Sequence, residues 1–408
     1  MTDIQISPDW LKAPALLAVF DALEAAGGEV RVNGGAVRNA LMGEPVSDVD
    51  LSTTLHPPQV IEALRFAGLK AVPTGIEHGT VTAVSDGTGF EVTTLREDVE
   101  TDGRRAVVKF ATDWSKDAER RDLTMNALYL DQEGRVFDPL SGIDDLRARN
   151  VRFVGDAETR IREDYLRVLR FFRFFAWYGD GRPDAAGLKA SAKLKDGLES
   201  LSAERVWAEL RKLLAAPDPS RALLWMRTTG VLTKVLPESE KWGIDAIKPL
   251  IEAEQKFGWE PDALLRLQAM IPPREDVVQG LAKRLKLPNA VRDRLLGWAH
   301  APDVAAVDDS KALRAALYGT RKHPHAVTDR LKLKAATASE GRAQWLGLLA
   351  DADAFSIPEL PVSGQDLLDH GFEAGKVIGE ALAKAEAKWV ASDFSMSKND
   401  LLNLIQER

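Results

Sequence analysis

The sequence predicts an α+β protein, in which a mixed α/β module of about 150 residues precedes a long region of helices. Short alternating or apolar segments, typical of strands, occur only in the first part of the chain. Beyond about residue 185, every segment has the apolar spacing of a helix. Because strands and helices do not alternate, we do not expect a βαβ fold.

Local signals place the expected elements of the first module. Gly27 and Gly28 end the first helix, and Pro57 and Pro58 open another. Residues 97–115 are polar and lack periodicity, so we expect a long, mobile loop there. The expected helices are 9–26, 36–42 and 57–68, and the expected strands are 29–32, 46–52, 80–85, 90–95, 127–131 and 135–138. The later helices are expected over 156–178, 202–215, 219–229, 261–270, 275–286, 288–299, 310–317 and 376–391.

The composition narrows the class of protein. The 408 residues include no cysteine, which excludes a disulfide framework, a thiolate zinc site and a cysteine nucleophile. We expect a cytoplasmic protein, because neither a signal peptide nor an apolar run of membrane-spanning length is visible. The net charge of −8 argues mildly against nucleic acid, yet residues 281–335 carry twelve Lys or Arg against five Asp. That basic stretch is either a nucleic-acid contact or a solvated helical face.

Two glycines and two aspartates form the first candidate site. Gly34 and Gly35 follow a short apolar run and open a helix with Arg38 in its first turn. Glycine backbone and helix-start amides can approach a phosphate, and arginine can bind it with two hydrogen bonds. Asp48 and Asp50 lie two apart in a predicted strand, so they share a face and offer oxygen ligands to Mg²⁺. The pattern predicts a site for a metal and a nucleoside triphosphate; an ordinary turn with an exposed acidic strand is the alternative.

Two further motifs carry matching chemistry. Glu91 could be a third carboxylate, as a metal ligand or a proton acceptor, if its strand lies beside that of the aspartates. An exposed strand glutamate is the alternative reading. Arg121 and its neighbours Arg120 and Asp122 precede an apolar run, and an arginine fork there suits a triphosphate. A surface ion pair would also explain this motif.

A charged stripe is expected on the helix over 156–178. Asp164, Arg167, Arg170 and Arg173 recur every three residues and would share one face. A carboxylate can accept the amino hydrogen of cytosine or adenine, and a guanidinium can donate to the adjacent ring nitrogen. Uracil and guanine present the reverse pattern, so one Asp/Arg pair could select C and A. An internal salt bridge is the alternative.

These motifs resemble those of the class II tRNA nucleotidyltransferase (CCA-adding enzyme) and bacterial poly(A) polymerase family. The resemblance covers about residues 25–235, and its motifs are residues 34–38 with 48–50, 120–127 and 163–170, in family order. Residues 90–105 are similar to the mitochondrial and alphaproteobacterial type, where this segment belongs to a flexible loop. Asn39 stands where the family usually has aspartate.

The resemblance implies template-independent addition of CCA to the tRNA 3′ end from CTP and ATP, with release of pyrophosphate and two Mg²⁺ ions. The implied roles are metal binding by Asp48 and Asp50, triphosphate binding by Gly35, Arg38 and Arg121, and base recognition by Asp164, Arg167, Arg170 and Arg173. The implied domains are a nucleotidyltransferase head over 1–150, a helical neck over 151–240, and a body and tail over 241–408 that hold the tRNA acceptor end. We expect no membrane contact and no obligatory protein partner.

Other functions are open at this point. A poly(A) polymerase shares every motif above, and a partial enzyme could add only C or only A. A non-catalytic RNA-binding protein on the same scaffold is also possible in principle, but it would not need the five polar residues Asp48, Asp50, Arg121, Asp164 and Arg167. A dinucleotide-binding fold is not expected, because Gly34-Gly35 lacks the Gly-x-Gly-x-x-Gly spacing.

Overall fold

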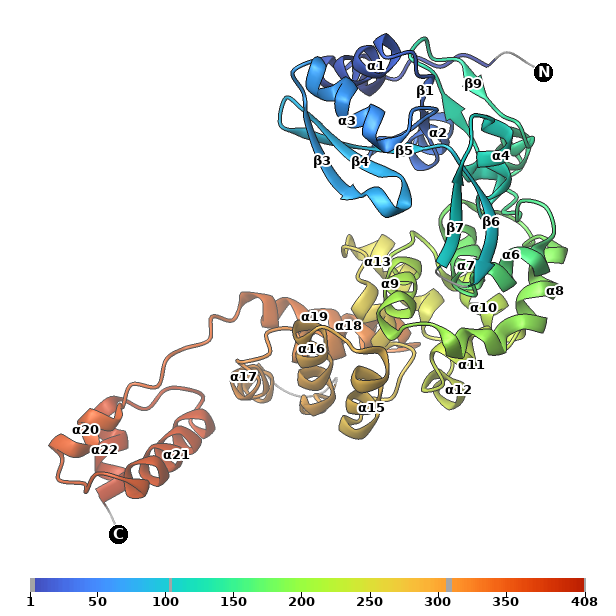
Figure 1. The fold of residues 1–408 in the computed structure, drawn as a ribbon. Helices are drawn as coiled ribbons and strands as arrows, with labels where there is room; N and C mark the ends of the chain where they lie inside the picture. The colour runs from blue at the N-terminus through green and yellow to red at the C-terminus, as the bar shows by residue number, and fades with distance from the viewer. Residues whose placement is uncertain (1–3, 103–104, 306–309, 407–408) are drawn as a thin grey trace. The chain divides into compact units, whose positions relative to one another are not determined.

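The computed structural model describes residues 4–102, 105–305 and 310–406. The chain divides into two compact units, Met1–Val235 and Leu236–Arg408, which we describe separately. All strands of the described residues lie in the first unit, and the second is built from helices (Figure 1), so the α+β prediction is confirmed. Within the described ranges, no helix is both long enough and apolar enough to cross a membrane.

A seven-stranded sheet organises the first unit, in the order β3-β4-β5-β2-β1-β8-β9. Strand β1 pairs with β2 and β8 in antiparallel fashion, while the central strand β2 pairs with β5 in parallel. Val32, Leu51 and Val92 on the three central strands are fully buried, which fixes the register of the sheet. The strands are β1 (Val30–Asn33), β2 (Asp50–Thr53), β3 (Lys70–Gly75), β4 (Thr80–Ser85), β5 (Thr88–Thr94), β8 (Tyr129–Leu130) and β9 (Val136–Phe137).

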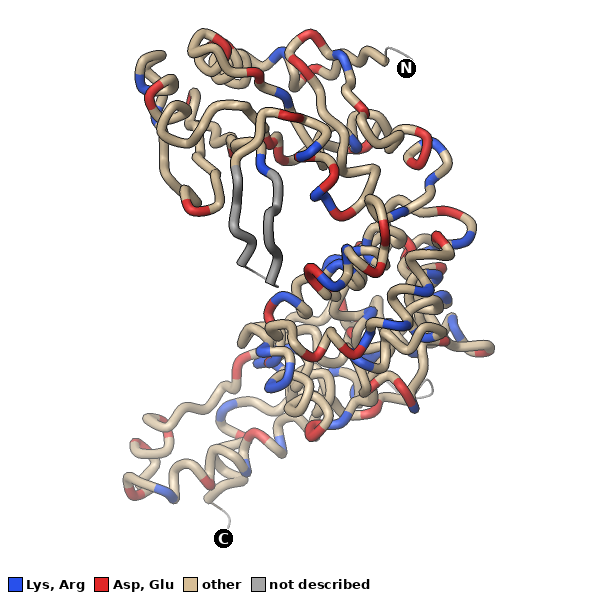
Figure 2. The backbone as a smooth tube through the Cα atoms, turned by 45° about the vertical axis from the view of Figure 1, so that its right-hand side comes forward, with Lys and Arg blue, Asp and Glu red and all other residues tan. Residues whose placement is uncertain are grey.

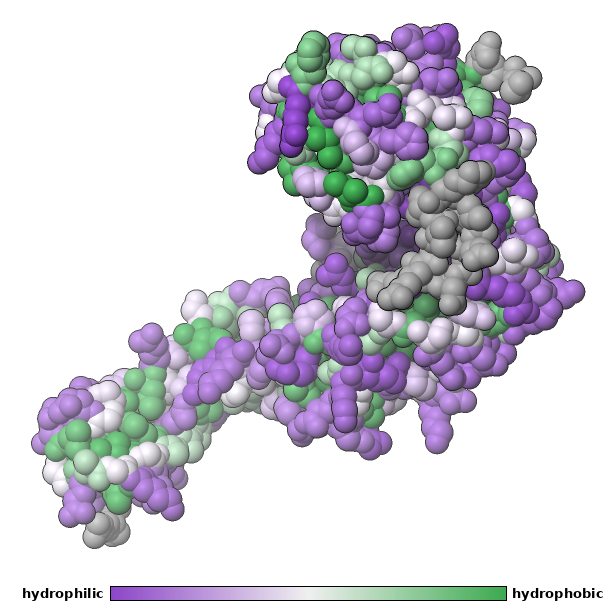
Figure 3. Space-filling view, viewed as in Figure 1, coloured by the Kyte–Doolittle hydropathy of each residue, from purple (hydrophilic) through white to green (hydrophobic). Residues whose placement is uncertain are grey.

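Helices α1 (Pro14–Ala25) and α3 (Pro57–Phe66) pack against each other and against β4. Each has proline in its first turn, where the missing N–H costs no hydrogen bond. Their inner faces bury Phe20 and Leu64 completely, whereas Phe66 is 95% exposed at the end of α3. Figure 3 shows hydrophobic residues on the surface of this part of the first unit.

The expectation of a loop over residues 97–115 is wrong. Strands β6 (Arg96–Asp102) and β7 (Arg105–Phe110) form a separate two-stranded antiparallel sheet, and α4 (Trp114–Glu119) follows. A two-stranded ribbon outside the main sheet does not require an apolar face, so its sequence need not alternate. Residues 103 and 104, part of the segment that resembles a flexible loop, lie outside the described residues.

The expected single helix over 156–178 is two helices, α6 (Ala157–Glu163) and α7 (Leu166–Tyr178). Asp164 has an extended backbone (φ −156°, ψ 108°), which breaks the helix between them. Phe171 and Phe172 on α7 are fully buried, and α7 packs against α9 and α10. The other helices of this unit are α2 (Gly35–Met42), α5 (Gly142–Arg147), α8 (Ala185–Leu194), α9 (Ala203–Leu214), α10 (Ser220–Thr228) and α11 (Val231–Val235).

The second unit consists of helices α12 to α22. Many basic side chains of residues 281–335 form ion pairs inside this unit, such as Arg294 with Asp262 at 2.5 Å and with Asp329 at 2.9 Å. Figure 2 shows acidic and basic residues interspersed along these helices. The helices are α12 (Ser239–Trp242), α13 (Ile247–Phe257), α14 (Ala263–Gln268), α15 (Glu275–Leu285), α16 (Asn289–His300), α17 (Ser310–Gly319), α18 (Ala326–Thr337), α19 (Arg342–Ala354), α20 (Gly364–Asp369), α21 (Lys376–Ala391) and α22 (Lys398–Gln406).

Candidate active site

The glycine turn joins β1 to α2. Gly34 has φ +64°, a conformation that glycine adopts without strain, and its N–H donates to the Leu128 carbonyl at 3.1 Å. Gly35 then opens α2, whose first amides have no partner within the helix. A Cβ on Gly34 would lie 3.3 Å from an Arg121 nitrogen, so the turn lies directly beside that guanidinium. These amides and the nearby cation form a surface suited to a phosphate.

Three carboxylates lie next to this turn. Asp50 is the first residue of β2. The sequence predicted that Asp48 also lies in this strand, but Asp48 precedes it. Because Leu51 pairs with Val92 in the parallel register, Asp50 and Glu91 precede paired positions on neighbouring strands. The strand that carries Glu91 therefore lies beside the strand of Asp50, as a role for Glu91 as a third carboxylate requires.

The other two carboxylates influence the pKa of Asp50. Burial raises its pKa, the negative charges of Glu91 and Asp48 raise it further, and Arg121 partly opposes them. Within the described ranges, no three acidic or histidine side chains are close enough together to hold a metal ion unaided. Asp48 and Asp50 still fit a hard divalent cation, since a bound cation would relieve this repulsion and phosphate oxygens could complete its ligands.

Arg121 is held from several sides. Its guanidinium donates to Asp117 at 3.1 Å, to the Tyr129 hydroxyl at 3.1 Å and to the Asn33 side chain at 3.0 Å. Burial disfavours the Asp117 carboxylate, but Arg120, Arg121 and Tyr129 outweigh it and lower its pKa to about 2. Asp117 was not among the residues predicted from the sequence, although its position three and four residues before the two arginines was an available signal.

Arg38 lies deeper, with 7% exposure, and bridges three elements. It donates to the side-chain oxygens of Asn39 (2.9 and 3.1 Å), Asn126 (2.5 Å) and Tyr178 (2.8 Å). Its guanidinium also lies 4.2 Å from the Tyr178 ring centroid. Arg38 thus connects α2 to α7, and a direct phosphate contact would use its remaining N–H capacity.

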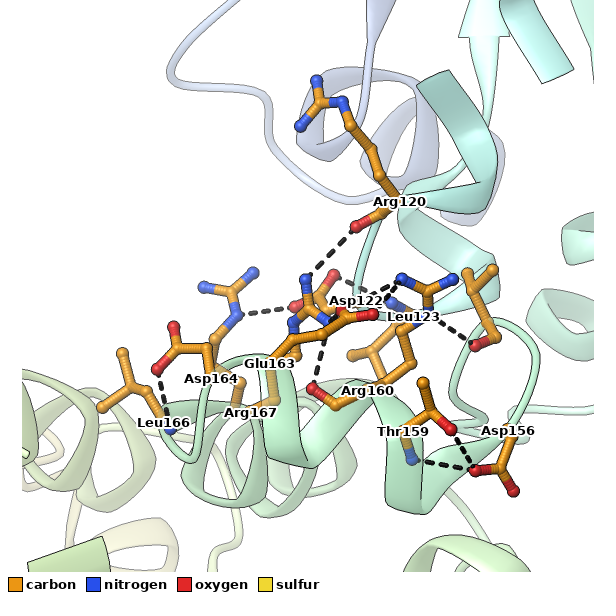
Figure 4. Close-up of polar contacts among 12 residues, drawn as sticks. Arg120, Asp122, Leu123, Asp156, Thr159, Arg160, Glu163, Asp164, Leu166 and Arg167 are labelled. Carbon is orange, nitrogen blue, oxygen red and sulfur yellow. Dashed lines mark hydrogen bonds and ion pairs between the residues drawn. The ribbon is translucent and has the colours of Figure 1, made fainter. Parts of the chain in front are cut away.

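The proposed base-reading residues lie where α6 meets α7 (Figure 4). Asp164 accepts a hydrogen bond from the Leu166 amide at 3.1 Å, as Figure 4 shows. It accepts a second one from Arg205 at 2.6 Å. Arg167 pairs with Glu163 and donates to the Arg120 carbonyl at 3.2 Å. The sequence predicted that Asp164 and Arg167 share one face of a continuous helix. Instead, the helix breaks at Asp164, and the two residues are joined by the turn that opens α7, where the Arg167 amide donates to the Asp164 carbonyl at 3.0 Å.

The remaining two arginines of the stripe are anchored to carboxylates. Arg170 donates to Asp122 at 2.6 Å, and Arg173 donates to Glu209 on α9 at 2.6 Å. Burial disfavours the Asp122 carboxylate, but Arg170 and the Asn126 amide outweigh it and lower its pKa to about 2. The partners Glu209 and Arg205 were not predicted from the sequence, because they lie too far along the chain from α7 to leave a local spacing signal.

Comparisons with known proteins place this arrangement in a family. Residues 30–152 match the family model for the poly A polymerase head domain, and residues 184–242 match the probable RNA and SrmB-binding site of polymerase A. The chain is 36% identical to the mitochondrial CCA tRNA nucleotidyltransferase 1 of Homo sapiens, over 93% of this chain and 87% of that protein. It is 31% identical to the CCA-adding enzyme of Streptococcus gordonii, over 91% of each. Among solved structures, the Bacillus stearothermophilus CCA-adding enzyme in complex with CTP superposes with a TM-score of 0.78 at 28% identity, covering 99% of this chain and 98% of that one.

Proposed function

Because the chain belongs to the family of CCA-adding tRNA nucleotidyltransferases, we propose that it adds CCA to the 3′ end of tRNA from CTP and ATP and releases pyrophosphate. The observation that carries this proposal is the group of Asp48, Asp50 and Glu91 beside the glycine turn of α2. This geometry joins oxygen ligands for a metal to backbone amides for a phosphate. Nucleotidyl transfer needs both in one place.

Within this proposal, Asp48 and Asp50 hold Mg²⁺, which when bound stabilises negative charge on the reacting phosphate. Glu91 is proposed as the group that accepts the proton of the RNA 3′-hydroxyl. The amides of Gly35 and its neighbours bind the triphosphate, and Arg121 stays beside them through Asp117. The hydroxyl oxygen then forms a bond to the α-phosphorus, and pyrophosphate leaves.

Base selection is proposed for the turn between α6 and α7. One oxygen of Asp164 already accepts from Arg205 and the other from Leu166, so its orientation is fixed and each oxygen keeps a further lone pair. Arg167 is held by Glu163 and by the Arg120 carbonyl. This pair would accept cytosine and adenine and leave a polar group unpaired against uracil or guanine.

The remaining assignments are proposals of the same kind. Residues 1–150 would carry out the chemistry, 151–240 would read the base, and 241–408 would hold the tRNA acceptor end, with no obligatory protein partner. A cytoplasmic location stays a prediction, while the names of the mouse and human relatives are those of mitochondrial proteins. Poly(A) synthesis is the second candidate, because the matched head model is named for poly A polymerases.

Extension of a tRNA that lacks its 3′ CCA tests the proposal. With Mg²⁺, we expect CTP alone to add two C residues and CTP with ATP to complete CCA, read at nucleotide resolution. A long ladder of A from ATP alone would make the protein a poly(A) polymerase. Addition of only C or only A when both are present would make it a partial enzyme, and no extension would contradict catalysis.

A further inference from the structure

One buried arginine at the site differs from all the others. Six of the seven arginines described at the site form an ion pair: Arg120 and Arg121 with Asp117, Arg167 with Glu163, Arg170 with Asp122, Arg173 with Glu209 and Arg205 with Asp164. Arg38 forms none with any residue that the structure describes, although it is only 7% exposed. Its hydrogen bonds all go to neutral oxygens, those of Asn39, Asn126 and Tyr178.

A buried charge without a counter-charge is unfavourable, because protein replaces water around it. Burial accordingly lowers the pKa of Arg38 and the charge of Arg173 lowers it further, while Tyr178 and the more distant Asp122 only partly oppose them. The charge nevertheless lies beside the phosphate surface: a Cβ on Gly35 would be 3.7 Å from Arg38 Nη2. In a poorly solvated setting, a positive charge acts on an anion several ångströms away even without direct contact.

Asn39 occupies the position from which a carboxylate could neutralise Arg38. Its Oδ1 accepts from both Nε and Nη2 of Arg38, at 3.1 and 2.9 Å, so one oxygen receives two N–H groups of the guanidinium. Its Nδ2 donates to the Pro45 carbonyl at 2.7 Å, three residues before Asp48. An amide can make both contacts, because it is donor and acceptor at once and carries no charge.

We propose that Asn39 determines the affinity for the triphosphate, because its neutral side chain leaves the charge of Arg38 for the phosphates of the substrate and of the pyrophosphate product. The inference rests on the proposed function, since the anion it names is the nucleotide substrate. It adds a residue that sets substrate affinity without touching substrate. Asn39 is therefore a positioning residue.

The test compares Asn39→Asp with Asn39→Leu in the full-length protein. Both variants lose the donor to Pro45. Aspartate keeps an acceptor for Arg38 and adds a charge, whereas leucine has the same number of side-chain heavy atoms as asparagine but removes the acceptor and adds no charge. We expect Asn39→Asp to bind CTP, measured by calorimetry with Mg²⁺ and without tRNA, about tenfold more weakly than wild type. Inhibition by inorganic pyrophosphate should weaken in parallel, and Asn39→Leu should change both much less.

Thermal unfolding separates this role from a purely structural one. Without ligand, Asn39→Asp should unfold at a higher temperature than Asn39→Leu, because aspartate pairs with the buried Arg38. Stability and CTP affinity then change in opposite directions between the two variants, whereas simple damage would lower both. Equal CTP affinity of the two variants would overturn the inference. If wild type fails to extend tRNA while the variants differ as described, the proposed function fails and the inference about Asn39 stands.

Discussion

The ion pair between Asp122 and Arg170 offers a quantitative test of how the site is held together. Asp122 is 9% exposed and accepts from Arg170 at 2.6 Å, from the Asn126 side chain at 3.2 Å and from the Leu123 amide at 2.9 Å. A pKa of about 2, against an ordinary value of 3.8, corresponds to roughly 2 kcal/mol of stabilisation of the folded state at neutral pH. Asp122→Asn removes this electrostatic stabilisation and places an amide group beside the donors that surround the carboxylate. We therefore expect the free energy of unfolding to fall by about 2–3 kcal/mol.

Urea unfolding of the full chain at pH 7 measures the free energy, and hydrogen exchange of peptides from α7 assigns the loss to this unit. The control is Arg162→Gln, which breaks an exposed pair with Glu158 at 3.9 Å and should change stability by less than about 0.5 kcal/mol. At pH 2.5 the difference between Asp122→Asn and wild type should shrink, because the carboxylate of the unfolded chain, with its ordinary pKa of 3.8, is then protonated while the native one is still largely ionised. An equal loss from both variants at pH 7 would refute the electrostatic account of this pair.

Further outcomes follow from the same geometry. Asp48→Ala should abolish nucleotide incorporation and leave tRNA binding by gel shift largely intact, and turnover comparable to wild type would remove the metal assignment. Arg167→Ala should relax base choice, and unchanged selection of C and A over U and G in single-nucleotide assays would contradict the template role. Glu91→Gln should slow single-turnover incorporation by about 10²-fold or more with little change in CTP affinity, and an unchanged rate would exclude Glu91 as proton acceptor. The pKa of Asp117 is lowered to about 2, so its stabilisation of the folded state is complete only well above the ordinary value of 3.8 and should be lost as the pH falls towards 2 in circular dichroism titrations. Asp117→Asn should weaken this loss of stability at low pH, and an unchanged acid titration would count against this group.

Local patterns predicted the parts of the fold that have local causes. The glycine turn before α2, the hairpin of β4 and β5 and the helical second unit follow from residue spacing alone. The parallel pairing of β2 with β5 was not predicted, because no residue near Asp50 or Glu91 indicates which strands pair. The ribbon of β6 and β7 was missed, because strands outside the main sheet need not alternate.

The site was predicted residue by residue, but not the contacts that hold it. Arg205 and Glu209 lie on α9, some forty residues from their partners Asp164 and Arg173, so only folding brings them together. The break at Asp164 was also missed, since no proline or glycine marks it. The unpaired state of Arg38 is likewise a tertiary property, because it depends on what Asn126 and Tyr178 contribute from distant segments.

The strand order of the sheet bears on how the protein can be made. Strand β1 pairs with β2 on one edge and with β8 on the other, and β9 pairs with the outer edge of β8. The strands β8 and β9 are synthesised about a hundred residues later than β1. The N-terminal segment is tied to the same late hairpin, since the Val136 amide donates to the Ile4 carbonyl and the Ile6 amide to the Gly134 carbonyl. A nascent chain that stalls on the ribosome before residue 137 therefore exposes an open strand edge, which is prone to aggregate. Translation speed across the first third of the message should accordingly influence the yield of folded protein.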